Sequence, residues 1–470
     1  MFKIFFIIIL IFGFFFRIFN LNFDDFWIDE MVSFWISDPD ITMQSTINRM
    51  FDSGNYNFLY EIFLKFFFQI TNYKIENARY ITSIFSCAAL ISSSYLAYII
   101  GGKKVSLFFL FLVSINIYLI KYSFELRYYS LAVFLSSILL IYFKKFLDKK
   151  SNSNLYITFF FGVLCILTHL YLALILISIF VYSIAISLKQ KKIESKFFIL
   201  NFLNFFFLFT YLLILFPIYK SFTDMGAHSY IPEIKPSFFT NFYFSKFFGS
   251  RIVGTLHLVI FIYLVYNFRK KIFSESYLNF IILLIFISYF LTILTSIIYK
   301  PVVQDRYLIF LLIPLIVVIT NLTFELNNFK KNLFFFLLIS SNLLNFLTEQ
   351  TFKQFFFTKY KTKPDFESVF KKIDKSNYKN FTFKLKDSNY FKINDVQENY
   401  IQHYLIKKNP SIKYLKDINL KKKYFIFWVI CIPDVHNKDC ELPEKMMKYK
   451  ILDDYNFNRI NLKLISKLRV

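Results

Sequence analysis

The chain has 470 residues, of which 56% are apolar and 18% charged, and its mean hydropathy is +0.48. Soluble globular proteins carry about 25% charged residues, so this composition excludes an ordinary soluble protein and indicates an integral membrane protein. The net charge of +24 is accompanied by no recognisable nucleic-acid-binding motif, and we therefore expect no nucleic acid among the partners.

Eleven apolar segments approach the length of about 20 residues that a helix needs to cross a bilayer. They lie at 4–19, 80–100, 105–120, 128–143, 155–168, 171–188, 197–217, 252–268, 277–298, 306–322 and 332–347. The first is interpreted as a retained span because no small-x-small cleavage site follows it. The sequence thus predicts an all-α polytopic membrane domain over 1–347 with about 11 transmembrane helices.

Lysine and arginine clusters recur in alternate connections between these spans. The clusters are Lys103 and Lys104, Lys144 to Lys150, Lys189 to Lys196, Arg269 to Lys271, and Lys330 and Lys331. The positive-inside rule then predicts a plasma-membrane protein with a cytoplasmic N-terminus. The apolar segment 58–70 contains Glu61 and Lys65, and counting it as a span would put the clusters outside. It is therefore predicted to be an interfacial helix on the outer membrane surface.

The segment 348–470 follows the last predicted span and is expected to face the exterior. A helical pattern at 365–373 and strand-like runs at 381–385 and 424–432 predict a small α/β domain. Cys431 and Cys440 lie in this domain, and a disulfide can persist outside the cytoplasm. Their spacing permits either a disulfide or two free thiols. Cys87 and Cys165 lie in predicted spans and are interpreted as buried apolar residues.

The first outer loop carries two adjacent carboxylates, Asp29 and Glu30, soon after Asp24 and Asp25. Neighbouring carboxylates repel one another, so one could act as a base while the other binds a partner. The alternative is an acidic loop that is simply solvated.

Three further outer connections place charged or aromatic side chains at the edge of the hydrocarbon. They contain Glu125 with Arg127 and Tyr128, His169 at a turn, and Arg306 with Tyr307. Ionisable groups at this depth are costly unless they are paired or functional, and arginine suits phosphate through a bidentate fork. Structural ion pairs, a structural histidine and an interfacial arginine are the alternatives.

Six short motifs together resemble the type C glycosyltransferase (GT-C) superfamily, in its bacterial protein O-mannosyltransferase-like and RgtA/B/C/D-like branch. In the order of the family they are Trp27 to Glu30, Tyr56 to Tyr60, Arg79 to Ser83, Glu125 to Tyr129, Thr168 to Tyr171, and Arg306 with Tyr307 and Pro314. The resemblance covers about residues 1–320. The second motif retains Asn57 and Tyr60 but lacks the His and both Pro of the family pattern.

The resemblance implies an inverting hexosyl or pentosyl transferase. Such an enzyme moves a sugar from a polyprenyl-phosphate donor to a glycan, lipid or protein acceptor of the cell envelope. Asp29 would be the general base, and Glu30 and Glu125 would shape the catalytic site. The implied substrate-binding residues are Asn57, Tyr60, Arg79, Arg127, Tyr128, His169, Arg306 and Tyr307.

The resemblance implies no metal ligands and no certain cofactor, although a divalent metal is left open. A polytopic transporter or a lipid-linked glycan flippase is the alternative from another class, and a structural membrane scaffold is a third. A transporter would place charged or broken-helix sites near mid-membrane in related halves. The sequence shows few charges within the spans and no such halves.

Overall fold

The structure is a computed structural model that describes residues 2–192, 194–224, 244–298, 304–348, 363–383, 395–415, 426–433, 440 and 449–467, with side chains placed except at 217–224, 244, 348 and 449. Contacts divide the chain into two compact units. The helical unit comprises Met1–Phe19, Gly54–Tyr60 and Tyr80–Lys353. The mixed unit comprises Asn20–Ser53, Glu61–Arg79 and Gln354–Val470. Most of the first outer loop thus groups with the C-terminal segment, and a domain boundary at 347/348 stays a prediction.

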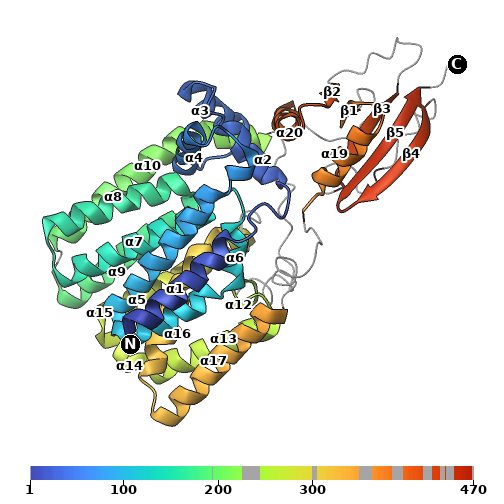
Figure 1. Cartoon of the computed structure of the whole chain (residues 1–470). Coiled ribbons are helices and arrows are strands. Elements are labelled where there is room, and N and C mark those ends of the chain that lie inside the picture. The colour runs from blue at the N-terminus through green and yellow to red at the C-terminus, as the bar shows by residue number, and fades with distance from the viewer. Residues whose placement is uncertain are drawn as a thin grey trace. The chain divides into compact units, whose positions relative to one another are not determined.

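The helical unit consists of helices that run alongside one another, as Figure 1 shows for α5, α7, α8 and α9. Its longer helices are α1 (Phe2–Ile18), α5 (Tyr80–Ser114), α7 (Tyr129–Asp148), α8 (Asn152–Thr168), α9 (Ala173–Gln190), α10 (Ser195–Asp224), α13 (Arg251–Asn267), α15 (Ser276–Ile298), α16 (Leu312–Phe324) and α17 (Asn328–Thr348). Short elements between them are α6 (Ile117–Ser123), η2 (Leu170–Leu172), α12 (Phe244–Phe247), α14 (Arg269–Ser274) and η4 (Asp305–Leu311).

Among the described residues, six helical stretches are long and apolar enough to cross a membrane. They are Ile75–Ser114, Tyr129–Asp148, Leu170–Gln190, Ser195–Phe216, Ser276–Ile298 and Asp305–Phe324. Two shorter apolar helices, Asn152–Thr168 and Arg251–Asn267, add to them. A mostly helical, membrane-compatible protein is therefore confirmed, whereas the count of eleven spans is not.

The predicted boundary between the spans 80–100 and 105–120 corresponds to a chain reversal inside α5. Gly102 has φ 77° and ψ −168°, a conformation that side-chain-bearing residues rarely adopt. Ser106 Oγ donates to the carbonyl of Ser94 at 2.8 Å. These residues would be about 18 Å apart along a straight helix, so the bond shows that the chain folds back on itself at this glycine.

The predicted span 105–120 is interrupted rather than continuous. Helix α5 ends at Ser114, and Asn116 starts α6 by accepting the N–H of Leu119 through its side chain at 3.0 Å. Arg17 is 1% exposed and donates to the carbonyls of Val113 (3.0 Å) and Ser114 (3.2 Å). The buried guanidinium thus satisfies backbone acceptors that the helix break leaves without intrahelical partners.

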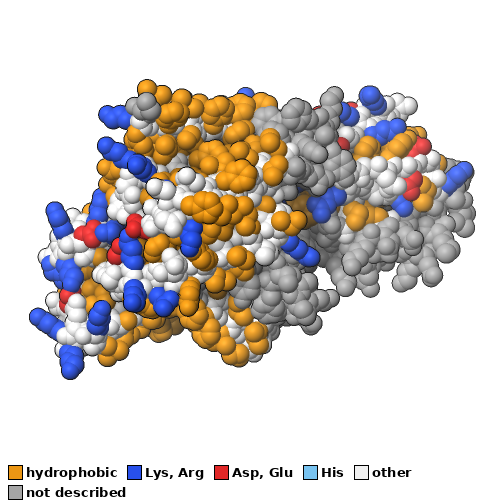
Figure 2. All heavy atoms as spheres, turned by 90° about the horizontal axis from the view of Figure 1, so that it is seen from below, with side chains coloured by type: hydrophobic (Ala, Val, Ile, Leu, Met, Phe, Trp, Pro, Cys, Tyr) orange, Lys and Arg blue, Asp and Glu red, His pale blue; other side chains and the backbone are white. Residues whose placement is uncertain are grey.

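Basic connections of the helical unit meet at one end, because side chains join one connection to another. The pairs are Lys144 with the Tyr277 ring (5.8 Å), Lys145 with the Tyr95 ring (5.8 Å), Lys150 with Glu194, and Lys271 with Glu325 (2.9 Å). Figure 2 shows lysine and arginine side chains gathered there beside hydrophobic surface. This arrangement agrees with the alternation of basic connections in the sequence.

The mixed unit begins with the short helices α2 (Ile28–Ile36), α3 (Met43–Asp52) and η1 (Ile75–Asn77). Helix α4 (Phe58–Ile70) starts in the helical unit and continues into the mixed unit, and its length is about 20 Å. Buried Glu61 accepts hydrogen bonds from Ser33 (2.7 Å) and Ser37 (2.8 Å). Phe63, Phe66 and Ile70 are exposed on one face of α4. That face supports the expected interfacial helix.

The C-terminal part of the mixed unit is a five-stranded sheet in the order β2-β1-β3-β5-β4. The strands are β1 (Asn380–Thr382), β2 (Lys413–Tyr414), β3 (Ile426–Cys431), β4 (Tyr449–Phe457) and β5 (Ile460–Lys467). Strand β1 pairs in parallel with β2 and β3, and β5 pairs antiparallel with β3 and β4. Helices α19 (Phe366–Lys375) and α20 (Asp395–Lys408) accompany the sheet (Figure 1).

These elements confirm the predicted helix at 365–373 and the predicted strands within 381–385 and 424–432. Residues 384–385 and 424–425 of the two runs lie outside the described ones. Trp428 in β3 is 1% exposed and donates its indole N–H to the carbonyl of Tyr378 at 3.0 Å. This bond fixes the chain that follows α19 against the sheet.

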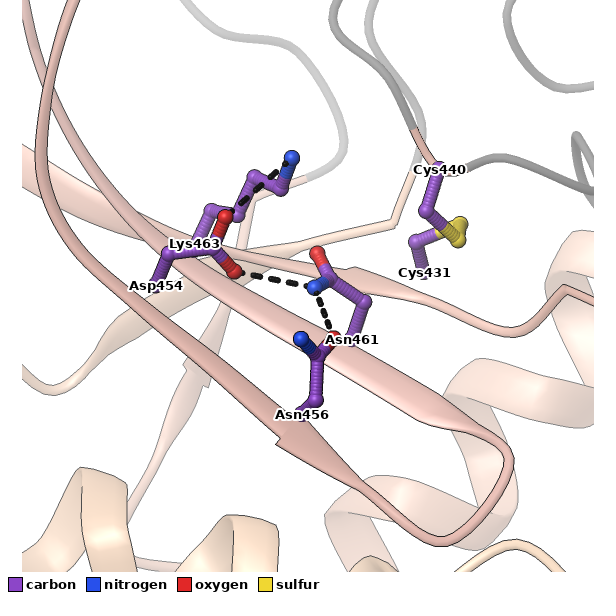
Figure 3. The surroundings of a disulfide bond; sticks show 6 residues. All are labelled: Cys431, Cys440, Asp454, Asn456, Asn461 and Lys463. Atoms are coloured by element: carbon purple, nitrogen blue, oxygen red, sulfur yellow. Dashed lines mark hydrogen bonds and ion pairs between the residues drawn. A yellow bond between two sulfur atoms is a disulfide. The ribbon is translucent and has the colours of Figure 1, made fainter.

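Cys431 and Cys440 form a disulfide, with their Cα atoms 5.9 Å apart. Figure 3 shows the bond beside the β4–β5 hairpin, where Asn461 donates to Asp454 (2.9 Å) and to Asn456 (2.6 Å). The alternative of two free thiols is therefore wrong in this structure. Cys87 and Cys165 are not in disulfides. Cys165 is buried as predicted, whereas Cys87 is only half-buried, so the prediction of a buried residue is wrong there.

Candidate functional site

The motif Trp27 to Glu30 forms the N-terminal turn of α2. Trp27 is the N-cap, and the Glu30 carboxylate reaches back to accept the Trp27 N–H at 2.9 Å. Acidic side chains in a first turn satisfy free N–H groups and interact favourably with the helix dipole, so the local sequence itself favours this turn. Asp29 and Glu30 are successive helical residues and therefore point about 100° apart.

Glu30 is enclosed and paired with two cations of the mixed unit. It is 1% exposed and accepts from Arg79 at 2.8 and 3.0 Å and from Lys363 at 2.6 Å. Burial alone would raise the pKa of Glu30, but Arg79 and Lys363 outweigh burial and lower this pKa to about 2. Glu30 is thus an ionised anchor that takes up no proton near neutral pH.

Arg79 fixes the loop that precedes α2. Besides Glu30, it donates to the carbonyls of Leu21 (2.8 Å), Asp24 (2.6 Å) and Asp25 (3.1 Å). Its guanidinium also lies 5.1 Å from the centre of the Phe26 ring. The bonds engage Nε and both terminal nitrogens with protein groups, so they assign Arg79 a positioning task. A direct contact of Arg79 with substrate stays a prediction.

The C-terminal segment supplies partners that sequence reasoning missed. Asp25 is 6% exposed, pairs with Lys408 and accepts the backbone N–H of Glu367 at 3.0 Å. The Tyr404 hydroxyl accepts the N–H of Phe26 at 3.3 Å. Nothing in the sequence pattern links residues more than 330 positions apart, and only the fold brings them together.

Asp29 differs from its neighbour Glu30 in its environment. Its side chain is half-buried, whereas Glu30 is almost fully enclosed. Arg79 and Lys363 donate hydrogen bonds to Glu30 and not to Asp29. Glu30 therefore holds the turn that carries Asp29, and the role of Asp29 as a base stays a prediction.

In the helical unit, three of the predicted motifs meet around His169. The imidazole stacks on Tyr128 (ring centres 4.4 Å apart) and on Tyr171 (5.3 Å), and it contacts Tyr307 (5.1 Å). His169 lies between α8 and η2, as the predicted turn requires. Tyr128 precedes α7 and Tyr307 lies in η4, so residues far apart in the sequence form one aromatic cluster.

Two guanidiniums approach the same histidine. Arg127 lies 5.5 Å from the Tyr128 ring centre, and Arg306 lies 5.9 Å from that of Tyr307. Burial first, and then the charges of Arg127 and Arg306, lower the pKa of His169 to about 3. His169 is therefore neutral at physiological pH, and the two positive charges belong to the arginines.

Acidic side chains border this cluster at Tyr122. Burial and the charges of Glu125 and Asp305 raise the pKa of the Tyr122 hydroxyl well above its ordinary value, while Arg306 opposes them. Asp305 also accepts a hydrogen bond from Tyr118 at 3.1 Å. Glu125, which the sequence predicted as a site residue, and Arg306 thus both act on the same tyrosine, Tyr122.

Asn57 and Tyr60 hold the start of α4 in the helical unit. Tyr60 is fully buried, and its hydroxyl lies 2.9 Å from Thr82 Oγ1. Asn57 is 6% exposed and donates to Asn55 at 2.6 Å. Both contacts are structural, and a role of either residue in substrate binding stays a prediction.

Among the described residues, no group of three or more His, Cys, Asp or Glu side chains is arranged to hold a metal ion. The sequence matches no known protein family, and no curated protein resembles it significantly. The likeness to GT-C enzymes consequently rests on the short motifs themselves.

Proposed function

We propose that this protein is a membrane glycosyltransferase that moves a sugar from a polyprenyl-phosphate donor to a cell-envelope acceptor. The observation that carries the proposal is the convergence of Arg127, Tyr128, His169, Arg306 and Tyr307 in the helical unit. Three motifs of the GT-C pattern, separated by up to 180 positions, supply these residues. A scaffold protein would give no reason for two arginines to share one aromatic cluster.

The chemistry of this cluster suits a phosphate. Paired guanidiniums near one point repel each other and favour an anion between or beside them. In the proposed reaction, negative charge grows on the leaving phosphate, and Arg127 and Arg306 would stabilise it in the transition state. A neutral His169 adds hydrogen-bonding capacity without a further charge, and the tyrosines offer ring faces and hydroxyls to a sugar.

Inverting transfer also needs a base for the acceptor hydroxyl, and by resemblance this base is Asp29. Its half-buried position supports the assignment, as does the pairing of its neighbour Glu30 with Arg79 and Lys363. Glu30, Arg79 and Lys363 would act through Asp29 by fixing the turn that bears it. In such a transfer the acceptor oxygen bonds to the anomeric carbon of the sugar, the bond from that carbon to the phosphate oxygen breaks, and the proton of the acceptor hydroxyl passes to Asp29.

We further propose that the aromatic cluster and the mixed unit lie on the extracytoplasmic side of the plasma membrane. The basic connections at one end of the helical unit support this orientation through the positive-inside rule. The disulfide between Cys431 and Cys440 supports it independently, because such bonds persist in oxidising compartments. The exposed face of α4, with Phe63 and Phe66, fits an outer interface.

Mass spectrometry of cell-envelope glycans from cells with and without the protein tests the proposal. The transferase account predicts that one sugar residue is lost from a defined glycan, lipid or protein and that the truncated acceptor accumulates. Loss of a transporter or flippase would instead leave whole lipid-linked precursors on the cytoplasmic side. An unchanged glycan profile would contradict the transferase.

A further inference from the structure

We propose that the groove between α9 and α10 binds an anionic phospholipid, whose phosphate is held by Lys191 and Lys192. The groove has a volume of about 810 Å³, lies wholly within the helical unit, and is separate from the aromatic cluster around His169. This inference is independent of the proposed transferase activity.

The walls of the groove suit an acyl chain. On α10, Phe198, Phe202 and Phe206 line it and are each about 60% exposed, and their rings stack in sequence at 6.4 and 6.2 Å. On α9, Ile184 and Leu188 line the facing side and are also exposed. Both helices belong to stretches that are long and apolar enough to cross a membrane, so an acyl chain is the occupant that these walls suit.

The length of the groove along α9 is close to the thickness of the hydrocarbon part of one leaflet. It runs along α9 from Phe180 to Lys191, which is about 16 Å of helix and roughly half of the hydrocarbon thickness of a bilayer. The walls are held together by the bond from Asn201 to Ser183 (2.7 Å) and by the ring contact of Phe180 with Phe205 (4.9 Å). The headgroup of a lipid whose acyl chain lies in the groove would thus lie at Lys191 and Lys192.

Charge complementarity selects an anionic headgroup. Lys191 and Lys192 are exposed at the mouth of the groove, at the C-terminal end of α9. The nearest acidic side chain in the sequence, Glu194, is paired with Lys150. Among the described residues, no ion pair joins Lys191 or Lys192, so both charges are available to a phosphate.

The location supports the same occupant. The mouth belongs to the end of the helical unit where the basic connections meet, which the positive-inside rule places at the cytoplasmic leaflet. Anionic lipids are enriched in that leaflet. The polyprenyl-phosphate donor of the proposed reaction would act at the opposite side, so the groove is not a donor site.

Native mass spectrometry of the full chain in detergent tests this inference, with phosphatidylglycerol and phosphatidylcholine as the titrated lipids. We expect one phosphatidylglycerol to bind more tightly than phosphatidylcholine. K191Q/K192Q should weaken phosphatidylglycerol binding by about tenfold or more, because each lysine near a phosphate contributes to attraction. The matched control K103Q/K104Q removes an exposed basic pair that does not line the groove, and it should bind as the parent does.

A second variant examines the apolar walls. Ser187→Trp fills the groove from α9 without changing its charge, and it should also reduce phosphatidylglycerol binding. Equal binding of both lipids, an unchanged affinity in K191Q/K192Q, or an equal loss in K103Q/K104Q would overturn the proposal. Occupancy by inorganic phosphate that competes fully with the lipid would show an anion site rather than a lipid site and would overturn it as well.

Discussion

Asp29 and Glu30 are adjacent carboxylates in different environments, and the sequence alone does not distinguish them. The difference arises from Arg79 and Lys363, which both bond to Glu30. The motif itself could be recognised from the sequence, and so could Arg79. Lys363, Lys408 and Tyr404 could not, because their contacts with the first loop depend on the tertiary fold alone.

Replacing Glu30 should change the dependence of stability on pH. The pKa of Glu30 is about 2 in the folded protein and near 4.5 ordinarily, so its stabilisation is present above pH 4.5 and is lost as the pH falls toward 2. Glu30→Gln should remove this pH dependence. It should also destabilise the protein at neutral pH by about 3–5 kcal/mol, because Arg79 loses its buried partner.

Thermal unfolding in detergent between pH 2 and 7 measures both effects. Glu367→Gln is the matched control, because Glu367 forms an exposed pair with Lys371 that contributes little. If Glu30→Gln and Glu367→Gln show the same melting curves, the ion-pair network is not a stabilising element.

Arg306 should bind the donor phosphate in a way that lysine cannot reproduce. Hydrogen bonds to a charged group are worth about 1.5–3 kcal/mol, so Arg306→Ala should weaken binding of a polyprenyl-phosphate sugar by about 10- to 100-fold. Arg306→Lys should recover only part of this loss, because a point charge lacks the bidentate fork. Arg269→Ala, at the basic end of the helical unit, is the control. Equal donor affinity in Arg306→Ala and the parent would remove Arg306 from the donor site.

At the scale of elements, the sequence correctly predicted the breaks that have a local cause. The turn at His169 and the reversal near Gly102 follow apolar runs that are interrupted by polar residues or glycine. The break at Asn116 was missed, although Asn116 caps α6 locally; the partner of the carbonyls that the break leaves at the end of α5 is Arg17, from another helix. Helix α20 was missed as well, since its apolar residues lack a clear helical period.

The reversal in α5 gives a direct test at this scale. Gly102→Ala should destabilise the protein by about 1–3 kcal/mol, because φ 77° with ψ −168° strains any residue that has a side chain. The reason is conformational rather than steric, since no atom lies within 4 Å of a Cβ built at this position. Lys103→Ala, one residue on and exposed, should leave the melting temperature nearly unchanged. An equally small effect of Gly102→Ala would show that the reversal does not depend on this glycine.

At the scale of the whole molecule, hydropathy and charge predicted a membrane protein with alternating basic connections. Six stretches of the described residues are long and apolar enough to cross a membrane, so the count of eleven spans stays a prediction. The sheet was only partly foreseen: β3 is an apolar run, whereas β4 contains the adjacent pairs Ile451–Leu452 and Asp453–Asp454, which interrupt the alternation typical of a strand. The pairing of Cys431 with Cys440 was left open by the sequence, because spacing cannot show whether two Cα atoms approach.

The disulfide and the orientation can be tested together. Peptides from protein that was alkylated before digestion should contain Cys431 linked to Cys440, with Cys87 and Cys165 outside any disulfide. Cys431→Ser should destabilise the mixed unit by about 2–3 kcal/mol, as expected for a closed loop of about ten residues.

Reporter fusions at Lys150, Lys192 and Lys331 should score cytoplasmic, and a fusion after Leu420 should score extracytoplasmic. Two alkylated thiols at Cys431 and Cys440, or a cytoplasmic reading at Leu420, would contradict an extracytoplasmic mixed unit.

In the proposed mechanism, Asp29 serves as the base in sugar transfer from a lipid-linked donor. The most direct measurement compares envelope glycans, by mass spectrometry, in cells that lack the protein and are complemented with the parent, Asp29→Asn or Asp24→Asn. Loss of a general base lowers rates by about 10²–10⁴-fold, so Asp29→Asn should leave the truncated acceptor in place, while Asp24→Asn should restore the sugar. Full restoration by a correctly inserted Asp29→Asn protein would contradict the role of Asp29 as the base.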